Sequence, residues 1–143
     1  MATFVIQHSW KRFQATVVNV ESDAFHMYLA DDTPATGDDV KADTTPITEQ
    51  FGYTEYVMGT AGVLGWFDGT TFWSLRNTAD KTWTASGGSF GPFKYVWIFD
   101  DTPNATPTDP LVGYWDVGAE TTITTGNSFL VDLDANFAIY DLS

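Results

Sequence analysis

Apolar and polar residues alternate along most of this chain, and a period of two is the repeat of a β-strand. Between residues 93 and 99 every odd position is aromatic, and the even positions are Lys, Val and Ile. We expect the aromatic side chains to share one face of a strand that lines the core, namely Phe93, Tyr95, Trp97 and Phe99. Further strands are expected at 3–7, 13–20, 24–30, 71–76, 81–85, 111–117, 129–134 and 135–142.

Pairs of turn-forming residues separate these segments: Asp68-Gly69, Gly87-Gly88, Gly91-Pro92, Asp109-Pro110 and Gly126-Asn127. Short strands divided by such turns predict a sandwich or a barrel. The best helix window, 47–58, contains Gly52 and lacks a sustained spacing of three and four. We therefore expect an all-β fold, an antiparallel β-sandwich or jelly-roll-like barrel with little or no helix. The length of 143 residues fits a single β domain, 1–143.

Two long polar segments, 31–48 and 100–110, interrupt the strands. Each begins with the same pattern, because Leu-Ala-Asp-Asp-Thr-Pro at 29–34 matches Ile-Phe-Asp-Asp-Thr-Pro at 98–103. The match hints at two related β halves. We favour a simpler interpretation, in which Asp and Pro recur because both end strands and form turns.

Composition narrows the possible functions. The chain carries 19 acidic and 6 basic side chains, a net charge of −13, and no cysteine. The charge argues against binding nucleic acid through its phosphates, and no apolar run is long enough to span a membrane. The lack of cysteine excludes disulfides, thiolate metal sites and a cysteine nucleophile. The first residues lack the pattern of a secretory signal, so we expect synthesis and use without export by the general secretory route.

Candidate chemistry is sparse. The two histidines, His8 and His26, lie on separate expected strands, and there is no Gly-x-Ser-x-Gly or phosphate-binding loop. No pair of carboxylates stands out as a general acid and base. Asp132, Asp134 and Asn136 imitate the start of a calcium loop but lack its glycine and distal glutamate. We expect no catalytic residue, no cofactor and no metal site.

Aromatic residues are concentrated in the middle third of the chain, at Trp66, Phe67, Phe72, Trp73 and Trp83. Aromatic side chains in alternating strands are usually core, which is the first interpretation. A subunit interface is the second, because Trp and Tyr dominate binding energies there. A platform for stacking a sugar ring is the third.

The second half of the chain contains several motifs in a fixed order. They are Trp-Thr-Ala-Ser-Gly-Gly-Ser-Phe-Gly-Pro-Phe-Lys-Tyr at 83–95, Asp-Asp-Thr at 100–102, Asp-Pro-Leu-Val-Gly-Tyr-Trp-Asp-Val-Gly at 109–118 and Gly-Asn-Ser-Phe-Leu-Val-Asp-Leu-Asp at 126–134. This order resembles a family of small virion structural proteins of tailed bacteriophages, over about half of the chain (Trp83 to Leu142). Lys94 and Asp100 stand where that family more often has Arg and Asn, and the first forty residues show no match.

The resemblance implies a non-catalytic head decoration or cement protein that binds the major capsid protein on the outer capsid surface. It also implies a homotrimer that is made in the host cytoplasm and ends in the virion. Our candidates for capsid contact are Lys11 and Arg12, together with the 31–48 segment and its Asp38 and Asp39.

Two other functions remain open at this point. A tail or fibre component, or a carbohydrate-binding module, would bind a glycan through Trp66, Trp73 or Trp83. An enzyme such as a depolymerase would need two carboxylates converging in a cleft.

Overall fold

The computed structural model describes residues 3–16, 18–19, 22–59, 64–69, 72–77, 80–102, 107–133 and 140–142. Within these ranges, 59, 64–69, 72–77 and 140–142 are described by their backbone only. The strands are β1 (Val5–Ile6), β2 (Phe25–Ala30), β3 (Tyr56–Gly59), β4 (Leu64–Gly69), β5 (Phe72–Asn77), β6 (Lys81–Thr84), β7 (Phe90–Asp100), β8 (Leu111–Ile123), β9 (Ser128–Val131) and β10 (Tyr140–Leu142). One α-helix, α1 (Trp10–Thr16), and one 3₁₀ turn, η1 (Lys41–Asp43), complete the described elements.

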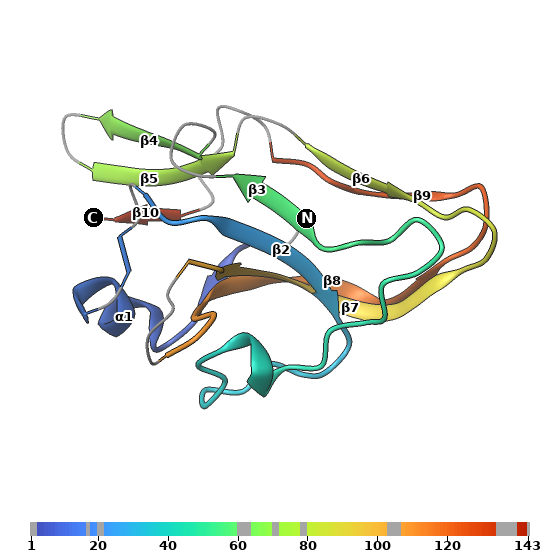
Figure 1. Ribbon diagram of the computed structural model, residues 1–143, viewed down its shortest axis with the longest axis horizontal. Coiled ribbons are helices and arrows are strands. Elements are labelled where there is room, and N and C mark those ends of the chain that lie inside the picture. Colours follow the sequence, from blue (N-terminus) through green and yellow to red (C-terminus); the bar gives the residue numbers. More distant parts are fainter. Residues whose placement is uncertain are drawn as a thin grey trace.

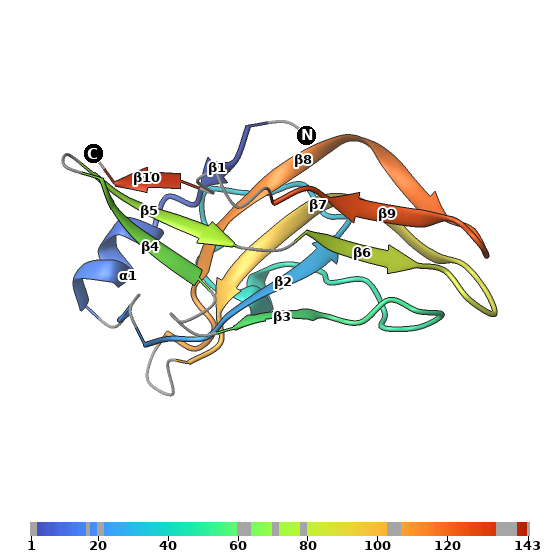
Figure 2. The same ribbon diagram turned by 90° about the horizontal axis from the view of Figure 1, so that it is seen from above.

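The strands of the described residues form three antiparallel sheets (Figures 1 and 2). A five-stranded sheet has the order β1-β8-β7-β2-β3, a three-stranded sheet the order β10-β5-β4, and β6 pairs with β9. The long strands β7 and β8 lie at the centre of the largest sheet. The all-β prediction is therefore confirmed. The strand predictions are also confirmed for 3–7, 24–30, 71–76, 81–85, 93–99, 111–117 and 129–134, with bounds shifted by a few residues.

Apolar side chains are buried on both faces of the five-stranded sheet. The first face carries Phe25, Met27 and Leu29 of β2 and packs against Trp83 and Val131 of the two-stranded sheet. The second face carries another cluster, which consists of Tyr28, Ala30, Tyr95, Trp97, Phe99 and Leu111. A sheet buried on both faces explains why the central strands read as nearly continuous apolar runs.

The position of Phe93 corrects one prediction. Phe93 does not share a face with Tyr95, Trp97 and Phe99, because it belongs to the cluster on the first face. The ladder between β7 and β8 is irregular on both sides of Phe93. Pro92 precedes it and has no N–H to donate, which suits a break in the ladder. A shift of one residue moves a side chain to the opposite face, while all four aromatic rings stay buried.

Helix α1 corrects a second prediction, since we expected a strand over 13–20. Trp10 and Phe13 are three residues apart, so one helical turn buries both on the same face. Trp10 then meets the ring of Phe25 edge-on, with ring centroids 6.1 Å apart. Neither helical element of the described residues is long and apolar enough to cross a membrane.

The polar 31–48 segment is a cover rather than a free loop. It crosses the second face of the five-stranded sheet, and η1 lies within it (Figure 1). Backbone hydrogen bonds fix it at several points, from Lys41 N–H to the Asp109 carbonyl, from Leu111 N–H to the Asp39 carbonyl and from Ile47 N–H to the Leu29 carbonyl. Lys41 of this segment lies over the rings of Tyr28 and Phe99, and Ile47 packs against the cluster of the first face.

Candidate functional site

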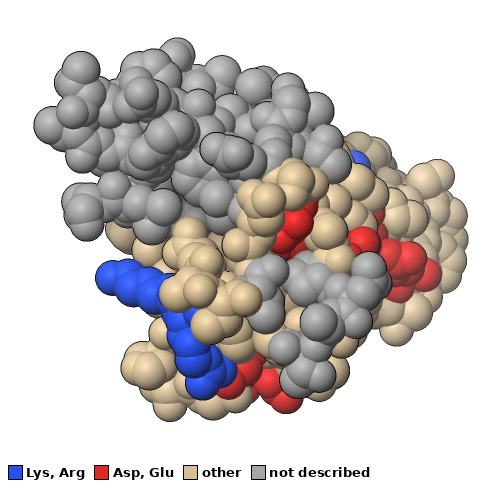
Figure 3. All heavy atoms as spheres, turned by 60° about the vertical axis from the view of Figure 1, so that its left-hand side comes forward, with Lys and Arg blue, Asp and Glu red and all other residues tan. Residues whose placement is uncertain are grey.

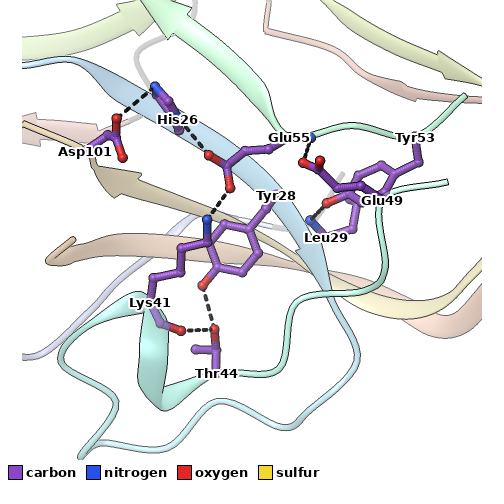
Figure 4. Close-up of polar contacts among 9 residues, drawn as sticks. All are labelled: His26, Tyr28, Leu29, Lys41, Thr44, Glu49, Tyr53, Glu55 and Asp101. Carbon is purple, nitrogen blue, oxygen red and sulfur yellow. Dashed lines mark hydrogen bonds and ion pairs between the residues drawn. The ribbon is translucent and has the colours of Figure 1, made fainter. Parts of the chain in front are cut away.

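A network of charged side chains lies where the polar cover meets the edge of the second face (Figure 4). His26 comes from β2, Lys41 from η1, Glu55 from the segment before β3 and Asp101 from the residue after β7. The Nδ1 atom of His26 lies 2.7 Å from Oε1 of Glu55, and its Nε2 atom lies 3.6 Å from Oδ2 of Asp101. The Lys41 ammonium donates to the other Glu55 oxygen. One carboxylate thus joins three separate parts of the chain.

Aromatic rings support the Lys41 end of this network. The ammonium lies 4.4 Å from the ring centroid of Phe99 and 5.4 Å from that of Tyr28. The Thr44 hydroxyl donates to the Lys41 carbonyl over 2.8 Å, which leaves its oxygen to accept from the Tyr28 hydroxyl at 2.7 Å. The cation is therefore held by ring faces and a carboxylate in a partly desolvated place, where such contacts are strongest.

The pKa of Glu55 shows how these contacts act. Burial alone raises this pKa, but the hydrogen bonds from His26 and Lys41 outweigh it, so the pKa lies below the usual 4.5. A depressed carboxyl pKa stabilises the folded state above the unfolded pKa, and this stability is lost as the pH falls through the folded pKa. Glu55 therefore makes its full contribution to the stability of the folded state at neutral pH.

Replacing Glu55 by Gln tests the network. We expect Glu55→Gln to lower the free energy of unfolding by about 1–3 kcal/mol at pH 7, because Lys41 and His26 lose their shared carboxylate. The difference from wild type should be smaller at pH 3 than at pH 7, because the stabilisation is lost as the pH falls below 4.5 and through the lowered pKa of the folded state. Urea unfolding at the two pH values measures it. The exposed Glu120, replaced in the same way, should change stability by less than about 0.5 kcal/mol at either pH.

Tyr53 precedes β3 and contacts β2 beyond the last residue pair that the two strands form. Its hydroxyl accepts a 2.8 Å hydrogen bond from Leu29 N–H, and its ring packs against Trp83 and Phe90. Burial raises the pKa of this phenol well above its usual 10, so it stays neutral. Glu49 accepts from Glu55 N–H at 2.7 Å and fixes the approach to β3 (Figure 4).

A second acidic site, which the sequence did not reveal, lies at the start of β2 and the end of β7. Asp23 and Asp100 are 6% and 0% exposed, and their carboxyls face each other. Asp100 Oδ1 accepts from Thr102 N–H at 3.0 Å, but its Oδ2 receives no hydrogen bond from a donor group of the described residues. Asp23 Oδ2 accepts from Asn19 N–H at 2.7 Å.

One proton bound between the two carboxyls removes the repulsion that two facing negative charges would have. The pKa of Asp100 is raised to about 8, chiefly by burial; the facing Asp23 carboxyl also raises it, and the hydrogen bond from Thr102 N–H opposes both. At neutral pH Asp100 is the protonated partner, and its Oδ2 can donate to Asp23. Because both carboxyls are almost fully covered, no substrate reaches them, and we interpret the pair as structural. Within the described part of the chain, no group of three or more His, Asp or Glu side chains is arranged to hold a metal ion.

The four candidate contact residues come together on one side of the molecule. Lys11 and Arg12 are exposed on α1, and Arg12 Nη2 lies 3.2 Å from Oδ2 of Asp39 in the polar cover. Asp38 accepts from Ala35 N–H at 2.7 Å and closes the turn next to that ion pair. Figure 3, which brings this side forward, shows basic side chains beside acidic ones. We call the surface of Lys11, Arg12, Asp38 and Asp39 the mixed-charge face.

The opposite end of the molecule carries no charge. Residues 50–54, 82–93 and 121–131 contain no Asp, Glu, Lys or Arg, although the whole chain has a charge of −13. Hydrogen bonds join these three segments, from Ser86 N–H to the Phe51 carbonyl, from Gly126 N–H to the Ala85 carbonyl and from the Thr125 hydroxyl to the Gly88 carbonyl. They form the right-hand end in Figures 1 and 2, where the β6–β7 and β8–β9 connections lie. We call these three segments the neutral end.

The remaining candidates from the sequence are the aromatic residues of the middle third, the residues that imitate a calcium loop, and His8. Trp83 is core, since it is 1% exposed and its indole N–H donates to the Thr54 carbonyl at 2.7 Å. It therefore does not form a sugar platform. The side chains of Trp66, Phe67, Phe72 and Trp73 lie outside the described residues, as do Asp134 and Asn136. His8 is exposed, and the described contacts connect it to neither acidic site.

Comparison with known proteins adds no relative. No family model matches the sequence, no curated protein matches it at a significant level, and no solved structure matches the fold. Function is therefore inferred from the residues and surfaces described above.

Proposed function

We propose that this protein is a structural component of a tailed-phage particle, a non-catalytic decoration protein that binds the major capsid protein on the outer head surface. Several copies, expected as a homotrimer, would dock on the shell through the mixed-charge face. The resemblance over Trp83 to Leu142 supports the virion setting, and the surface of the fold supports a role in binding.

The observation that carries this proposal is the assembly of the mixed-charge face from two distant segments. The Gln7 side chain is 5% exposed and donates to the carbonyls of Ala35 and Asp38, at 2.9 Å to the former. The Arg12–Asp39 pair lies beside these bonds. A rigid surface loses little conformational freedom on binding, which is what a docking surface needs.

The energetics of that face suit a shell contact. Arg12 and Asp39 are substantially exposed, so their mutual attraction contributes about 1 kcal/mol at most and both remain available to a partner. Affinity for a particle would then accrue from several linked copies rather than from one deep pocket. The charge of −13 keeps the free protein soluble before it docks.

A charge reversal on α1 tests the proposal. We expect the double variant Lys11→Glu/Arg12→Glu to bind shells of the major capsid protein from the same phage at least tenfold more weakly than wild type, a loss of about 1.4 kcal/mol. Lys94→Glu/Lys81→Glu makes the same change in net charge away from that face and should bind like wild type. Co-sedimentation with empty shells and quantitative gels gives occupancy, with hundreds of copies per particle expected. Wild type that stays in the supernatant, or that is present in only a handful of copies per virion, would refute a head decoration role.

A further inference from the structure

The neutral end displays an aromatic side chain in a strained position. Phe51 has a φ of 50°, which bulky residues rarely adopt, and it is 43% exposed. Its ring lies against the backbone of Gly88, where a Cβ atom would come within 2.6 Å of the ring. Two backbone hydrogen bonds fix this turn. Ser86 N–H donates to the Phe51 carbonyl, and Tyr53 N–H donates to the Gln50 carbonyl. A strained backbone conformation that leaves 43% of an apolar residue exposed points to a contact with a partner.

The outer face of the β6–β9 ribbon continues this surface. Thr82 lies opposite Leu130 and Thr84 opposite Ser128, and all four side chains are exposed, Leu130 by 51%. The Thr84 and Ser128 hydroxyls lie 2.7 Å apart. The Phe51 turn borders the same ribbon, because a Cβ on Gly52 would meet the Thr84 carbonyl. Phe51 and Leu130 thus flank a strip of hydroxyl groups.

Charge and hydrogen bonding together indicate what covers this surface. Two copies of a chain with a charge of −13 repel each other wherever acidic faces meet, but they can approach through a part that has no charge. Hydroxyl groups both donate and accept, so a strip of Thr and Ser can pair with a copy of itself, which a surface of one charge cannot do. An aromatic and a leucine beside such a strip supply the apolar anchors of an interface.

We propose that copies of this chain bind one another through the neutral end, with Phe51 and Leu130 as the anchors. The proposed function expects an assembly of identical copies, and this proposal identifies the surface through which they bind. The biological role of the association rests on that proposed function. It leaves the mixed-charge face of each copy free for the shell. The association is a property of the free protein, so it can fail or hold independently of capsid binding.

Analytical ultracentrifugation of free protein over a wide concentration range tests the proposal. Wild type should have a mass of more than one chain, and Phe51→Asp and Leu130→Asp should each raise the apparent dissociation constant at least tenfold. Val57→Asp is the matched control, because Val57 is also an exposed apolar residue, at 60%, but lies on β3 outside the neutral end. Circular dichroism confirms that each variant is folded. Monomeric wild type at all concentrations, or Asp variants that associate like wild type, would overturn the proposal.

The absence of cysteine offers a second readout that does not depend on anchor substitutions. In Thr84→Cys the thiol should react with a maleimide at least tenfold more slowly at high protein concentration than at low concentration. In Ala42→Cys, on the exposed surface of η1, the rate should be independent of concentration. Equal rates for Thr84→Cys at both concentrations would also overturn the proposal. If the protein associates as expected but does not bind shells, only the decoration function fails.

Discussion

At pH 9 the variant Asp100→Asn is expected to be more stable than the wild type by about 2–5 kcal/mol. Asn copies the shape of a protonated Asp, and its amide N–H can donate to Asp23 while its oxygen still accepts from Thr102 N–H. The wild-type pair must instead lose its shared proton above pH 8 and bury two facing negative charges. The substitution removes that cost without creating a cavity.

The pH dependence has a definite sign. The pKa of Asp100 rises from 3.8 to about 8 on folding, through burial and then through Asp23, so between these values the folded state holds a proton that the unfolded state has lost. Stability from this pair therefore falls as the pH rises through that window. The advantage of Asp100→Asn should be near zero at pH 4, grow through pH 6 and 7, and level off above pH 8. Urea denaturation at these pH values measures it.

The repeated pattern in the sequence provides the control. Asp31 occupies the position in the first Asp-Asp-Thr-Pro sequence that Asp100 occupies in the second, but it is exposed. Asp31→Asn should change stability by less than about 0.5 kcal/mol at every pH. If Asp100→Asn is destabilising at pH 9, or if its effect does not vary with pH, the two carboxyls do not share a proton.

Gly52→Ala is expected to be the most destabilising single-methyl change at the neutral end, at about 3 kcal/mol. Gly52 has a φ of 92°, and an added Cβ would lie 2.2 Å from the Thr84 carbonyl oxygen. That oxygen belongs to the backbone of β6, so it can move only if the ribbon moves. The left-handed conformation adds a further penalty for any residue with a Cβ. Chemical denaturation gives the difference in stability, and the Phe51 turn should lose its fixed position.

Gly87→Ala separates the cost of the left-handed backbone conformation from the cost of the steric clash. Gly87 also has a positive φ, of 74°, but nothing lies within 4 Å of an added Cβ. This variant carries the backbone penalty alone, and we expect a loss of about 1 kcal/mol. Equal losses for the two variants would show that Gly52 does not lie against β6 as described.

The strands and most of the core were predictable from the sequence because alternation is a local signal. A run such as Phe93 to Phe99 can satisfy its side chains only as a buried strand, and the turn residues around it mark the ends. The face of Phe93 was not predictable, since one irregularity in the ladder reverses it. Helix α1 was missed because a helix of seven residues, with Trp10 and Phe13 as its only buried residues, is too short to show a period.

The charged sites depend on contacts between distant residues, which a single sequence does not show. Asp31 and Asp100 begin identical motifs, yet only Asp100 meets a second carboxyl, because β2 and β7 are neighbours and bring Asp23 to it. Lys41 likewise stands in a polar segment that gives no sign of the two aromatic rings beneath it. Of the candidate contacts, the sequence identified Arg12 and Asp39 separately, and the fold places them together.

The order of strands in the large sheet also constrains how the chain acquires its structure during synthesis. Phe25 at the start of β2 pairs with Asp100 at the end of β7, so the pairing closes a loop of about seventy-five residues. The adjacent β7 and β8, by contrast, are separated only by residues 101–110, so their pairing closes a much smaller loop. We therefore expect β2, α1 and the polar cover of a nascent chain to remain without their native contacts to the large sheet until β7 has left the ribosome. Folding is then completed late, around the β7–β8 hairpin.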